Sequence, residues 1–335
     1  MPTDEMEPLR VVAIGGGTGL SALLKGLKRY APIDITAVVT VTDDGGSSGR
    51  LRRDFEILPP GDIRNCMVAL SEDEALLSRL FQYRFAGGRG LAGHSFGNLF
   101  LTALTQITGE FSEAVKQSSK ALAIMGSIYP STSRNVQLEA QLVDGKVVRG
   151  ETRISRSRKR IERIRLQPRV CRPMPETLAA IAAADLITLG PGSLFTSVIP
   201  NLLVAGVAKA IANSPAVKAY FVNLMWQPGE TIDFRASDHI LALQKHARVP
   251  KLIDYAVVNS SPIGRAALRR YEAMNVCPVE NDVAAIRALG IEVTTAGLIE
   301  KGQQVRHSPE ASAAVAIELA RKGRQKRRPQ KTIET

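Results

Sequence analysis

Hydrophobic runs alternate with polar, glycine-rich loops along most of the chain. The apolar stretch from Val11 to Ile14 breaks into clustered glycines and resumes with helical spacing, which predicts a strand, a tight loop and a helix. The β-branched run Ile35–Val41 likewise ends in a polar, glycine-rich loop over residues 42–49. Two such loops at the ends of successive strands are typical of a doubly wound α/β fold, whose ligands bind outside the carboxyl ends of the strands.

The second half of the sequence repeats this pattern. Asp185–Leu189 reads as a buried strand followed by a glycine turn and a helix, and Ala219–Leu224 and Ile253–Asn259 read as two further strands. We therefore expect a Rossmann-like, doubly wound and mostly parallel sheet with helices on both faces. The predicted domain covers residues 10–320, after an N-terminal extension over residues 1–9.

The periodicity changes between these two halves. Val136–Leu142 alternates apolar and polar residues, Asp144-Gly145 supplies a tight turn, and apolar residues return over Val147–Ile154, which predicts a β-hairpin. An arginine-rich stretch, Arg156–Arg165, follows. We expect a small inserted hairpin and Arg-rich subdomain at about residues 131–172, whose arginines form a solvated face or bind phosphate.

The composition is ordinary for a globular protein, with 44% hydrophobic residues in a chain of 335. Its three dispersed cysteines, an odd number, argue against a disulfide framework and favour a reducing compartment. The first residues carry acid where a signal peptide carries base. The most apolar later stretch, Ser193–Ala212, contains polar residues and reads as a buried helix. We expect a cytoplasmic protein without a membrane span.

The positive charge is concentrated in two segments. Of the net charge of +12, Arg149–Arg172 carries +8 and Arg321–Lys331 carries +7, so the rest of the chain carries −3. The body of the protein is therefore not basic. We expect residues 321–335 to form a disordered basic tail. Binding of nucleic acid through these segments rests on charge alone, because no aromatic residues are interleaved with the arginines for base stacking.

The glycine cluster is the strongest chemical signal. A loop without β-carbons lets backbone amides approach a phosphate closely, and the positive end of the following helix adds attraction. The predicted phosphate-binding residues are Gly15, Gly16, Gly17, Thr18 and Gly19. A dinucleotide fingerprint would need a third glycine where Leu20 stands, and no P-loop Gly-Lys-Ser/Thr follows. A turn that merely joins strand to helix is the structural alternative.

Further polar residues follow the second predicted strand. Ser47 and Ser48 could donate additional hydrogen bonds to a phosphate. Asp43 and Asp44 are adjacent, and in a turn both could reach one ligand. Because Mg²⁺ favours one or two carboxylates together with substrate phosphates, Asp44 is the candidate metal residue. The alternative is that both carboxylates only cap the loop.

Two later motifs supply the remaining local candidates. Asp62 stands at a predicted helix N-cap, with Asn65 one turn on. His94 and Asn98 open another predicted helix on one face. His94 is a candidate general acid or base, although no second histidine or cysteine lies nearby in the sequence, which favours a role in orienting a ligand.

Five motifs in order resemble the bacterial gluconeogenesis factor family, the YvcK-like branch of the CofD-like superfamily. They are Ile14–Leu20, Val41–Leu51, Pro59–Asn65, Gly93–Asn98 and Leu189–Ser197. The resemblance runs from about residue 10 to about residue 310. It implies a Rossmann-like fold that binds UDP-sugars, UDP-N-acetylglucosamine in particular, and a role in cell shape and envelope precursor supply during gluconeogenic growth. No reaction is established for this branch.

The resemblance also implies an enzymatic alternative and further site residues. The related 2-phospho-L-lactate transferase branch uses the same crevice with Mg²⁺ and acidic residues that match Asp43 and Asp44. Tyr271 and Arg306 lie in segments similar to those associated with the nucleotide-sugar, where a tyrosine can stack on uracil and an arginine can pair with a diphosphate. Packing on the sheet and a surface ion pair are their structural alternatives. The remaining ligand candidates are Gly192, Ser193 and Asn223.

The resulting hypothesis is a non-enzymatic UDP-sugar-binding regulatory protein whose occupancy reports precursor level to an unidentified protein partner. The alternative is a Mg²⁺-dependent transferase. A homodimer is expected by analogy.

Overall fold

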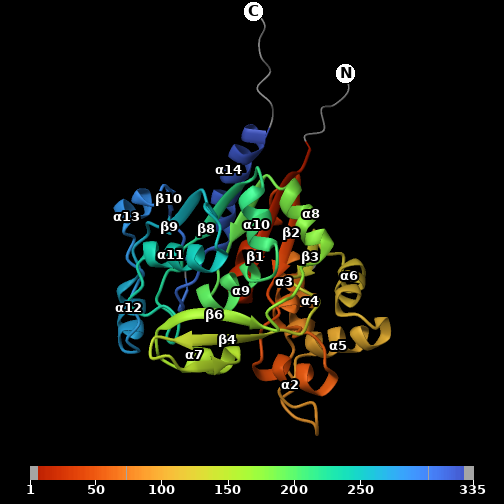
Figure 1. Cartoon of the computed structure of the whole chain (residues 1–335). Helices are drawn as coiled ribbons and strands as arrows, with labels where there is room; N and C mark the ends of the chain where they lie inside the picture. The colour runs from red at the N-terminus through yellow and green to blue at the C-terminus, as the bar shows by residue number, and fades with distance from the viewer. Residues whose placement is uncertain (1–6, 73, 301, 328–335) are drawn as a thin grey trace, which may run out of the picture.

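A seven-stranded parallel sheet forms the centre of the molecule (Figure 1). The computed structural model describes residues 7–72, 74–300 and 302–327. The strand order is β10-β9-β8-β7-β1-β2-β3. This confirms the predicted Rossmann-like, doubly wound sheet, although β3 and β10 were not anticipated. The strands are β1 Leu9–Gly15, β2 Ile33–Val39, β3 Ser127–Pro130, β7 Leu186–Leu189, β8 Val217–Phe221, β9 Tyr255–Asn259 and β10 Glu292–Ala296.

The order of the strands reverses at the middle of the sheet. The chain moves outward from β1 to β2 and β3, then returns to β7 on the other side of β1 and moves outward again. Val11–Ile14 of β1 pair in parallel with Leu186–Leu189 of β7, so the carboxyl ends of these two strands are adjacent. In doubly wound folds the ligand crevice lies at this reversal.

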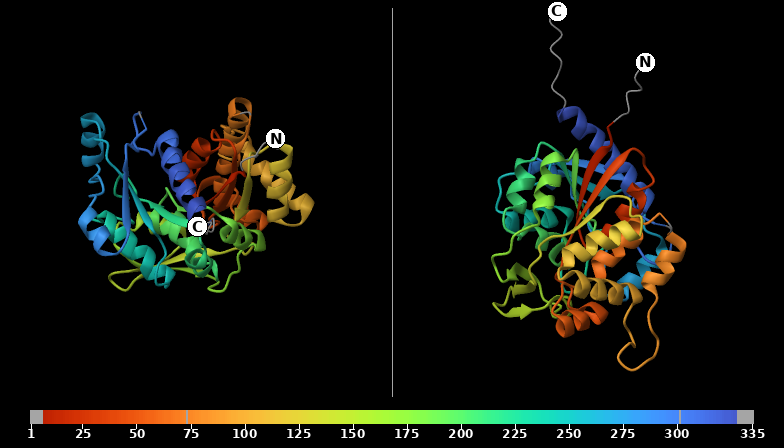
Figure 2. Two further views of the ribbon diagram at one scale, coloured as in Figure 1. Left: turned by 90° about the horizontal axis from the view of Figure 1, so that it is seen from above. Right: turned by 90° about the vertical axis from the view of Figure 1, so that its right-hand side faces the viewer.

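Helices cover both faces of the sheet (Figure 2). On one face α1, α3 and α14 pack together, and α8, α10 and α11 lie on the other. Strands covered on both sides must be apolar along their whole length, and the central strands have continuous buried runs. These helices are α1 Gly17–Leu27, α3 Gly61–Leu70, α8 Pro175–Ala183, α10 Val207–Asn213, α11 Ala236–Ala247 and α14 Pro309–Arg327.

The remaining helices of the main domain lie in the longer connections. Between β2 and β3 the chain forms α2 Gly46–Phe55, α4 Glu74–Gln82, α5 Phe96–Thr108 and α6 Phe111–Ala121, besides α3. Between β9 and β10 it forms α12 Arg265–Glu272 and α13 Val283–Ala288.

The apolar stretch Ser193–Ala212 is mostly buried, as predicted, but it is broken into three pieces. These are the π-helical turn η1 Leu194–Val198, α9 Ile199–Leu202 and the first part of α10. No single helix of the described residues is long and apolar enough to span a membrane. One bent pair, Leu194–Leu202 with Val207–Asn213 at 77°, passes the same test by length and composition alone.

The insertion contains the predicted hairpin and a third strand. β4 Gln137–Leu142 pairs with β5 Val147–Arg149 on one side and with β6 Ile161–Gln167 on the other, all antiparallel. The arginine-rich stretch therefore contributes a strand of its own. The prediction that the hairpin's second strand extends to Ile154 was wrong, because Glu151–Arg156 forms helix α7. Gly150, with a φ of 90°, turns the chain before α7 begins.

The basic C-terminal segment also differs from expectation. Residues 321–327, predicted to be disordered, form the last turns of α14. A β-carbon on Gly323 would lie 1.9 Å from the Asp185 carbonyl oxygen, so the helix lies directly against the start of β7. Arg324 Nη2 lies 2.5 Å from Asp185 Oδ2, and Arg327 donates to the Ala184 carbonyl at 2.8 Å. These hydrogen bonds hold the segment in place. Residues 328–335 of the predicted tail and residues 1–6 of the predicted extension lie outside the described residues.

Candidate functional site

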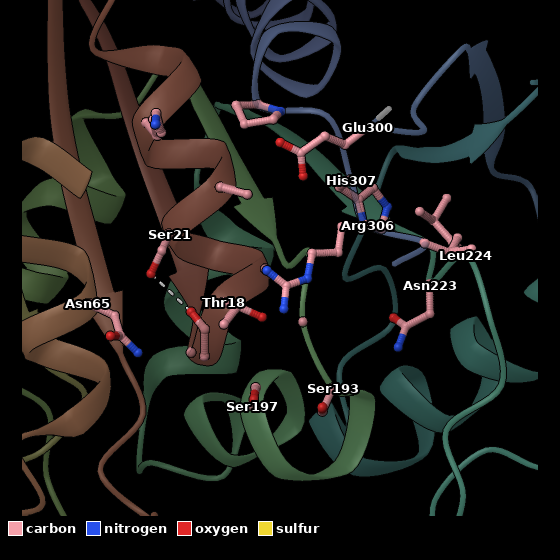
Figure 3. A pocket seen from close by; sticks show the side chains of 18 of the residues that line it. Thr18, Ser21, Asn65, Ser193, Ser197, Asn223, Leu224, Glu300, Arg306 and His307 are labelled. Carbon is pink, nitrogen blue, oxygen red and sulfur yellow. Dashed lines mark hydrogen bonds between the residues drawn. The ribbon is translucent and has the colours of Figure 1, made fainter. Parts of the chain in front are cut away.

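A cavity of about 560 Å³ lies outside the carboxyl ends of β1 and β7 (Figure 3). Its volume is in the usual range for small-molecule sites. The walls come from the start of α1, the loop after β7, the loop after β8, and the segment that precedes α14. Ten sequence-predicted residues line it: Gly16, Gly17, Thr18, Gly19, Asn65, Gly192, Ser193, Asn223, Tyr271 and Arg306.

The glycine loop places the N-terminus of α1 at the cavity. β1 ends at Gly15 and α1 begins at Gly17, whose φ of +65° suits glycine. Gly16 is the N-cap and offers no side-chain cap, and the first turn of α1 contains no acidic residue. The first amides of a helix have no partner within the helix, so those of Thr18 and Gly19 are suited to bind an anion.

Packing requires glycine at two positions of this loop. A β-carbon on Gly16 would lie 2.5 Å from Thr40 Cγ2 and 2.7 Å from Asp62 Oδ2. A β-carbon on Gly19 would lie 2.5 Å from the backbone oxygen of Pro191. The loop after β1 and the loop after β7 are therefore in direct contact, and larger residues would push them apart.

The start of the helical turn after β7 already donates its hydrogen bonds to a carboxylate of the protein, Glu230. The Phe195 amide donates to Glu230 Oε2 at 3.1 Å, and Thr196 Oγ1 donates to Glu230 Oε1 at 3.0 Å. Burial raises the pKa of Glu230 to about 7, although these hydrogen bonds act in the opposite direction. Because Asp62 accepts only from the Gly17 amide at the start of α1, the Thr18 and Gly19 amides are the ones suited to bind an anionic ligand.

A chain of amide hydrogen bonds forms the wall opposite α1. Asn223 Nδ2 donates to Gln227 Oε1 at 2.8 Å, and Gln227 Nε2 donates to Ser193 Oγ at 2.6 Å. Asn223 Oδ1 is buried and has no hydrogen-bond partner within the described residues. A buried acceptor of this kind is costly unless a ligand N–H or water pairs with it. Figure 3 shows Asn223 and Ser193 across the cavity from Thr18.

Arg306 extends from the segment before α14 toward Thr18 and the N-terminus of α1 (Figure 3). Two neighbours hold this segment. Tyr271 Oη accepts a hydrogen bond from the Val305 amide at 3.2 Å, and His307 Nε2 lies 3.2 Å from the Val222 carbonyl oxygen. Burial lowers the pKa of His307 to about 4, so its imidazole is neutral at neutral pH and donates to that carbonyl. Arg306 therefore carries the positive charge of this segment.

Four predicted ligand residues form a separate buried cluster at the start of α2. Ser47 Oγ lies 3.0 Å from His94 Nδ1, and Asn98 Nδ2 donates to Ser47 Oγ at 3.1 Å and to Ser48 Oγ at 3.4 Å. None of the four lines the cavity. His94 precedes α5, whose N-cap is Ser95, so the prediction that it shares a helix face with Asn98 was wrong. Burial lowers the pKa of His94.

Asp62 lies beneath the glycine loop. The prediction that it caps α3 was wrong, because the N-cap is Pro60 and Asp62 belongs to the first helical turn. Its carboxylate accepts a hydrogen bond from the Gly17 amide. Burial and the nearby Asp43 charge raise the pKa of Asp62 to about 6, despite this hydrogen bond. Asp62 thus supports the loop rather than lining the cavity.

Asp43 and Asp44 both accept hydrogen bonds from other groups of the protein. Asp43 Oδ1 accepts from the Gly45 amide at 2.8 Å, which is a cap within the loop. Asp44 Oδ1 accepts from the Thr152 amide at 2.9 Å and from Thr152 Oγ1 at 2.6 Å. Asp44 therefore joins the loop after β2 to α7 of the insertion.

The comparisons with known proteins agree with this architecture. The family model for 2-phospho-L-lactate transferase CofD matches residues 11–299. The gluconeogenesis factor of Bacillus subtilis is 46% identical over 311 residues, which cover 92% of this chain and 98% of that protein. A putative gluconeogenesis factor of Aquifex aeolicus is 49% identical over 321 residues, covering 94% of this chain and 97% of its own length.

The chain belongs to the gluconeogenesis factor family, within the CofD group. A crystal structure of a UPF0052 family member from Bacillus halodurans, 44% identical, superimposes with a TM-score of 0.90 and covers 93% of this chain and 100% of that one.

The described residues offer less support for a metal site than for an anion site at the glycine loop. Within residues 7–72, 74–300 and 302–327, no group of three or more His, Cys, Asp or Glu side chains is arranged to hold a metal ion. In Asp44, the candidate metal ligand, Oδ1 already accepts two hydrogen bonds from Thr152. Mg²⁺ at Asp44 stays a prediction, and would depend on waters and ligand phosphates for most of its coordination.

Sequence reasoning missed several residues of the cavity. Ser197 and His307 stand inside motifs that resemble the family, so their motifs were recognised but not their positions. Gln227 carries no local signal, because its role depends on a hydrogen bond to Ser193 across the loop after β7. The other missed polar residues are Ser21, Lys25, Ser78, Gln82 and Glu300.

Proposed function

We propose that this protein binds UDP-sugars, UDP-N-acetylglucosamine in particular, and acts as a cytoplasmic regulatory protein rather than an enzyme. Its occupancy would report envelope precursor supply to a protein partner during gluconeogenic growth. Membership of the gluconeogenesis factor family supports the physiological setting. The observation that carries the ligand class is Arg306 facing the N-terminus of α1 across a cavity of about 560 Å³.

This arrangement suits a diphosphate that is substituted at both ends. The amides of Thr18 and Gly19 and the Arg306 guanidinium would grip the phosphates from two sides, and an arginine can do so with two parallel hydrogen bonds. The Tyr271 ring can stack on uracil, and Asn223 Oδ1 can accept from the uracil imide or from an acetamido N–H. Asn65, which lines the cavity beyond α1, would bind sugar hydroxyls.

Isothermal titration with UDP-N-acetylglucosamine tests the proposal. The substitution Arg306→Gln should weaken binding by a factor of about 10 to 100, because a charge-assisted hydrogen bond contributes roughly 1.5–3 kcal/mol. Arg287→Gln, at an exposed arginine of α13 outside the cavity, is the matched control and should bind as the wild type does. Absence of heat with the wild-type protein at millimolar ligand would overturn the proposal.

The transferase alternative is favoured by one observation, the match to the 2-phospho-L-lactate transferase model. It requires Asp44 to take part in the reaction with Mg²⁺. With water or an added hydroxyl compound as the acceptor of the sugar, UDP release from UDP-N-acetylglucosamine should then depend on Mg²⁺ and disappear in Asp44→Asn, with an unchanged melting temperature. A lower melting temperature in Asp44→Asn without loss of UDP release would instead favour the structural alternative, in which the carboxylate only holds Thr152.

A further inference from the structure

A second, strongly basic cavity lies between the insertion and α11. It has a volume of about 250 Å³ and is lined by β6, by the end of α11 and by Leu203 after α9. No aspartate or glutamate lines it. We call it the basic cavity, and its five cationic residues are Arg163, Arg165, Arg169, Lys245 and Arg248.

These five cations lack the carboxylate partners that nearby basic residues have. Arg149 of the same insertion pairs with Glu139 at 3.0 Å, and Lys159 pairs with Asp144 at 2.5 Å. No such ion pair involves the five cations within the part of the chain that the structure describes. Lys245 Nζ instead donates to the backbone carbonyl of Glu162 at 3.0 Å. Like charges gathered around one cavity create a positive potential that attracts anions.

Carboxylates on the adjoining elements β4, β6 and α11 are engaged elsewhere or line another cavity. Glu139 lies opposite Arg165 in the β4–β6 ladder, but its Oε2 accepts from Arg149. Glu162 and Asp238 line the neighbouring cavity on the other side of Lys245. Arg163 lies opposite Gln141, which is uncharged. The charge of the basic cavity is thus not cancelled across the sheet.

The floor of the basic cavity is preformed. His246 Nε2 accepts from the Ile164 amide of β6 at 3.0 Å, and His246 Nδ1 donates to the Ala242 carbonyl at 2.7 Å. Burial, together with the charges of Lys245, Arg163 and Arg248, lowers the pKa of His246 to about 4, so the imidazole is neutral at neutral pH. Both ring nitrogens are engaged, which fixes α11 to the edge of β6. A ligand therefore need not order this floor on binding.

We propose that the basic cavity binds a small phosphorylated metabolite that carries at least two negative charges, at a site separate from the glycine loop. The planar guanidinium groups of Arg163 and Arg248 suit phosphate oxygens. The concave shape and the apolar side chains of Leu166 and Leu203 suit a compact ligand with a carbon skeleton. No Phe, Tyr or Trp lines the cavity to stack nucleic-acid bases, which favours a small molecule over an oligonucleotide.

A local footprint tests this proposal with tripolyphosphate as the probe. The full chain is treated with an amine-reactive acetylating reagent, with and without tripolyphosphate, and the modification of each lysine is measured by peptide mass spectrometry. We expect tripolyphosphate to slow the labelling of Lys245 and to leave Lys116, an exposed residue of α6, unchanged. Because the readout is local, binding of the probe at the glycine loop does not affect it. Equal labelling of Lys245 in both samples would overturn the proposal.

Substitutions in the basic cavity test whether the protection of Lys245 from acetylation arises from tripolyphosphate bound there. The double substitution Arg163→Gln with Arg248→Gln should weaken tripolyphosphate binding about tenfold or more, since hydrogen bonds to charged groups are lost. Arg53→Gln, an exposed arginine of α2, is the control and should retain protection. Replacing the same pair by lysines keeps the charge and should give intermediate protection. Undiminished protection in the glutamine double variant, with an unchanged melting temperature, would refute the site.

A competing ligand class is tested in the same assay. A single-stranded oligonucleotide should protect Lys245 no better than tripolyphosphate at equal phosphate concentration. Stronger protection by the oligonucleotide would overturn the small-molecule proposal in favour of a nucleic-acid surface on the insertion.

Discussion

The charge of Asp62 should oppose both folding and ligand binding above a pH of about 6. Burial raises the pKa of its carboxyl from the ordinary value of about 3.8 to about 6. Each pKa unit corresponds to about 1.4 kcal/mol, so ionised Asp62 costs up to about 3 kcal/mol at pH 7 relative to the unfolded chain. The substitution Asp62→Asn removes this cost and keeps an amide oxygen that can accept the Gly17 N–H.

The sign of the pH dependence follows from where the proton is held. The folded protein keeps the Asp62 proton to a higher pH than the unfolded chain does. The contribution of Asp62 to the free energy of unfolding therefore falls as pH rises from about 4 to about 6 and is then constant. Asp62→Asn should therefore be more stable than the wild type at pH 7 and 8, and the difference should vanish toward pH 4. Urea unfolding followed by circular dichroism at several pH values measures this difference.

Asp34→Asn, at an exposed position of β2, serves as the matched control and should track the wild type. Ionised Asp62, which accepts from the Gly17 amide, also places a negative charge beneath the loop whose Thr18 and Gly19 amides would bind a diphosphate. Wild-type affinity for UDP-N-acetylglucosamine should consequently decrease as pH rises through about 6, whereas the affinity of Asp62→Asn should stay level. A constant stability difference at every pH, or a less stable Asp62→Asn at pH 8, would refute the assigned burial of this carboxylate.

Three further predictions concern packing. Gly26→Ala should lower the free energy of unfolding by about 2 kcal/mol or more, because its β-carbon would lie 2.0 Å from the Pro309 carbonyl oxygen. Gly87→Ala is the control and should change the free energy of unfolding little, because nothing lies within 4 Å of its β-carbon. Truncation after residue 320 should lower the melting temperature, because it removes the contacts of Arg324 with Asp185; an unchanged melting temperature would contradict this. His246→Phe should cost about 1–3 kcal/mol by leaving the Ile164 amide unpaired, a loss that thermal unfolding would detect.

Within the seven-stranded sheet, the strands that the sequence predicts are those covered on both faces. β1, β2, β7, β8 and β9 have buried apolar runs, which a single sequence reveals directly. The two edge strands were missed for physical reasons. β3 has four residues and ends at Pro130, and β10 is only partly buried and contains Glu292, Thr294 and Thr295. Edge strands need no continuous hydrophobic run, so their pattern resembles that of a loop.

Tertiary hydrogen bonds explain the errors in the insertion and in the second loop. Thr152 and Ile154 fit the alternation of a strand, but Thr152 bonds to Asp44, a residue far away in the sequence, and the chain coils into α7. Ser47 and His94 were recognised as polar groups near loops, yet their side chains hydrogen-bond to each other and neither lines the cavity. Local motifs identify which loops meet, whereas the direction of each side chain depends on packing.

The close contact of α1 with α14 links the beginning of the sequence to its end. Gly26 lies against the backbone of Pro309, and Arg306 stands only three residues before that contact. The connecting residues therefore act as a spacer of fixed length between the helix pairing and the guanidinium. An insertion at positions 307 or 308 would displace Arg306 from the glycine loop even though every other residue of the cavity is retained. We expect a fusion after Arg327 to be tolerated. The C-terminal end of α14 lies at the end of the molecule opposite α2, and a partner attached there would extend outward (Figure 1).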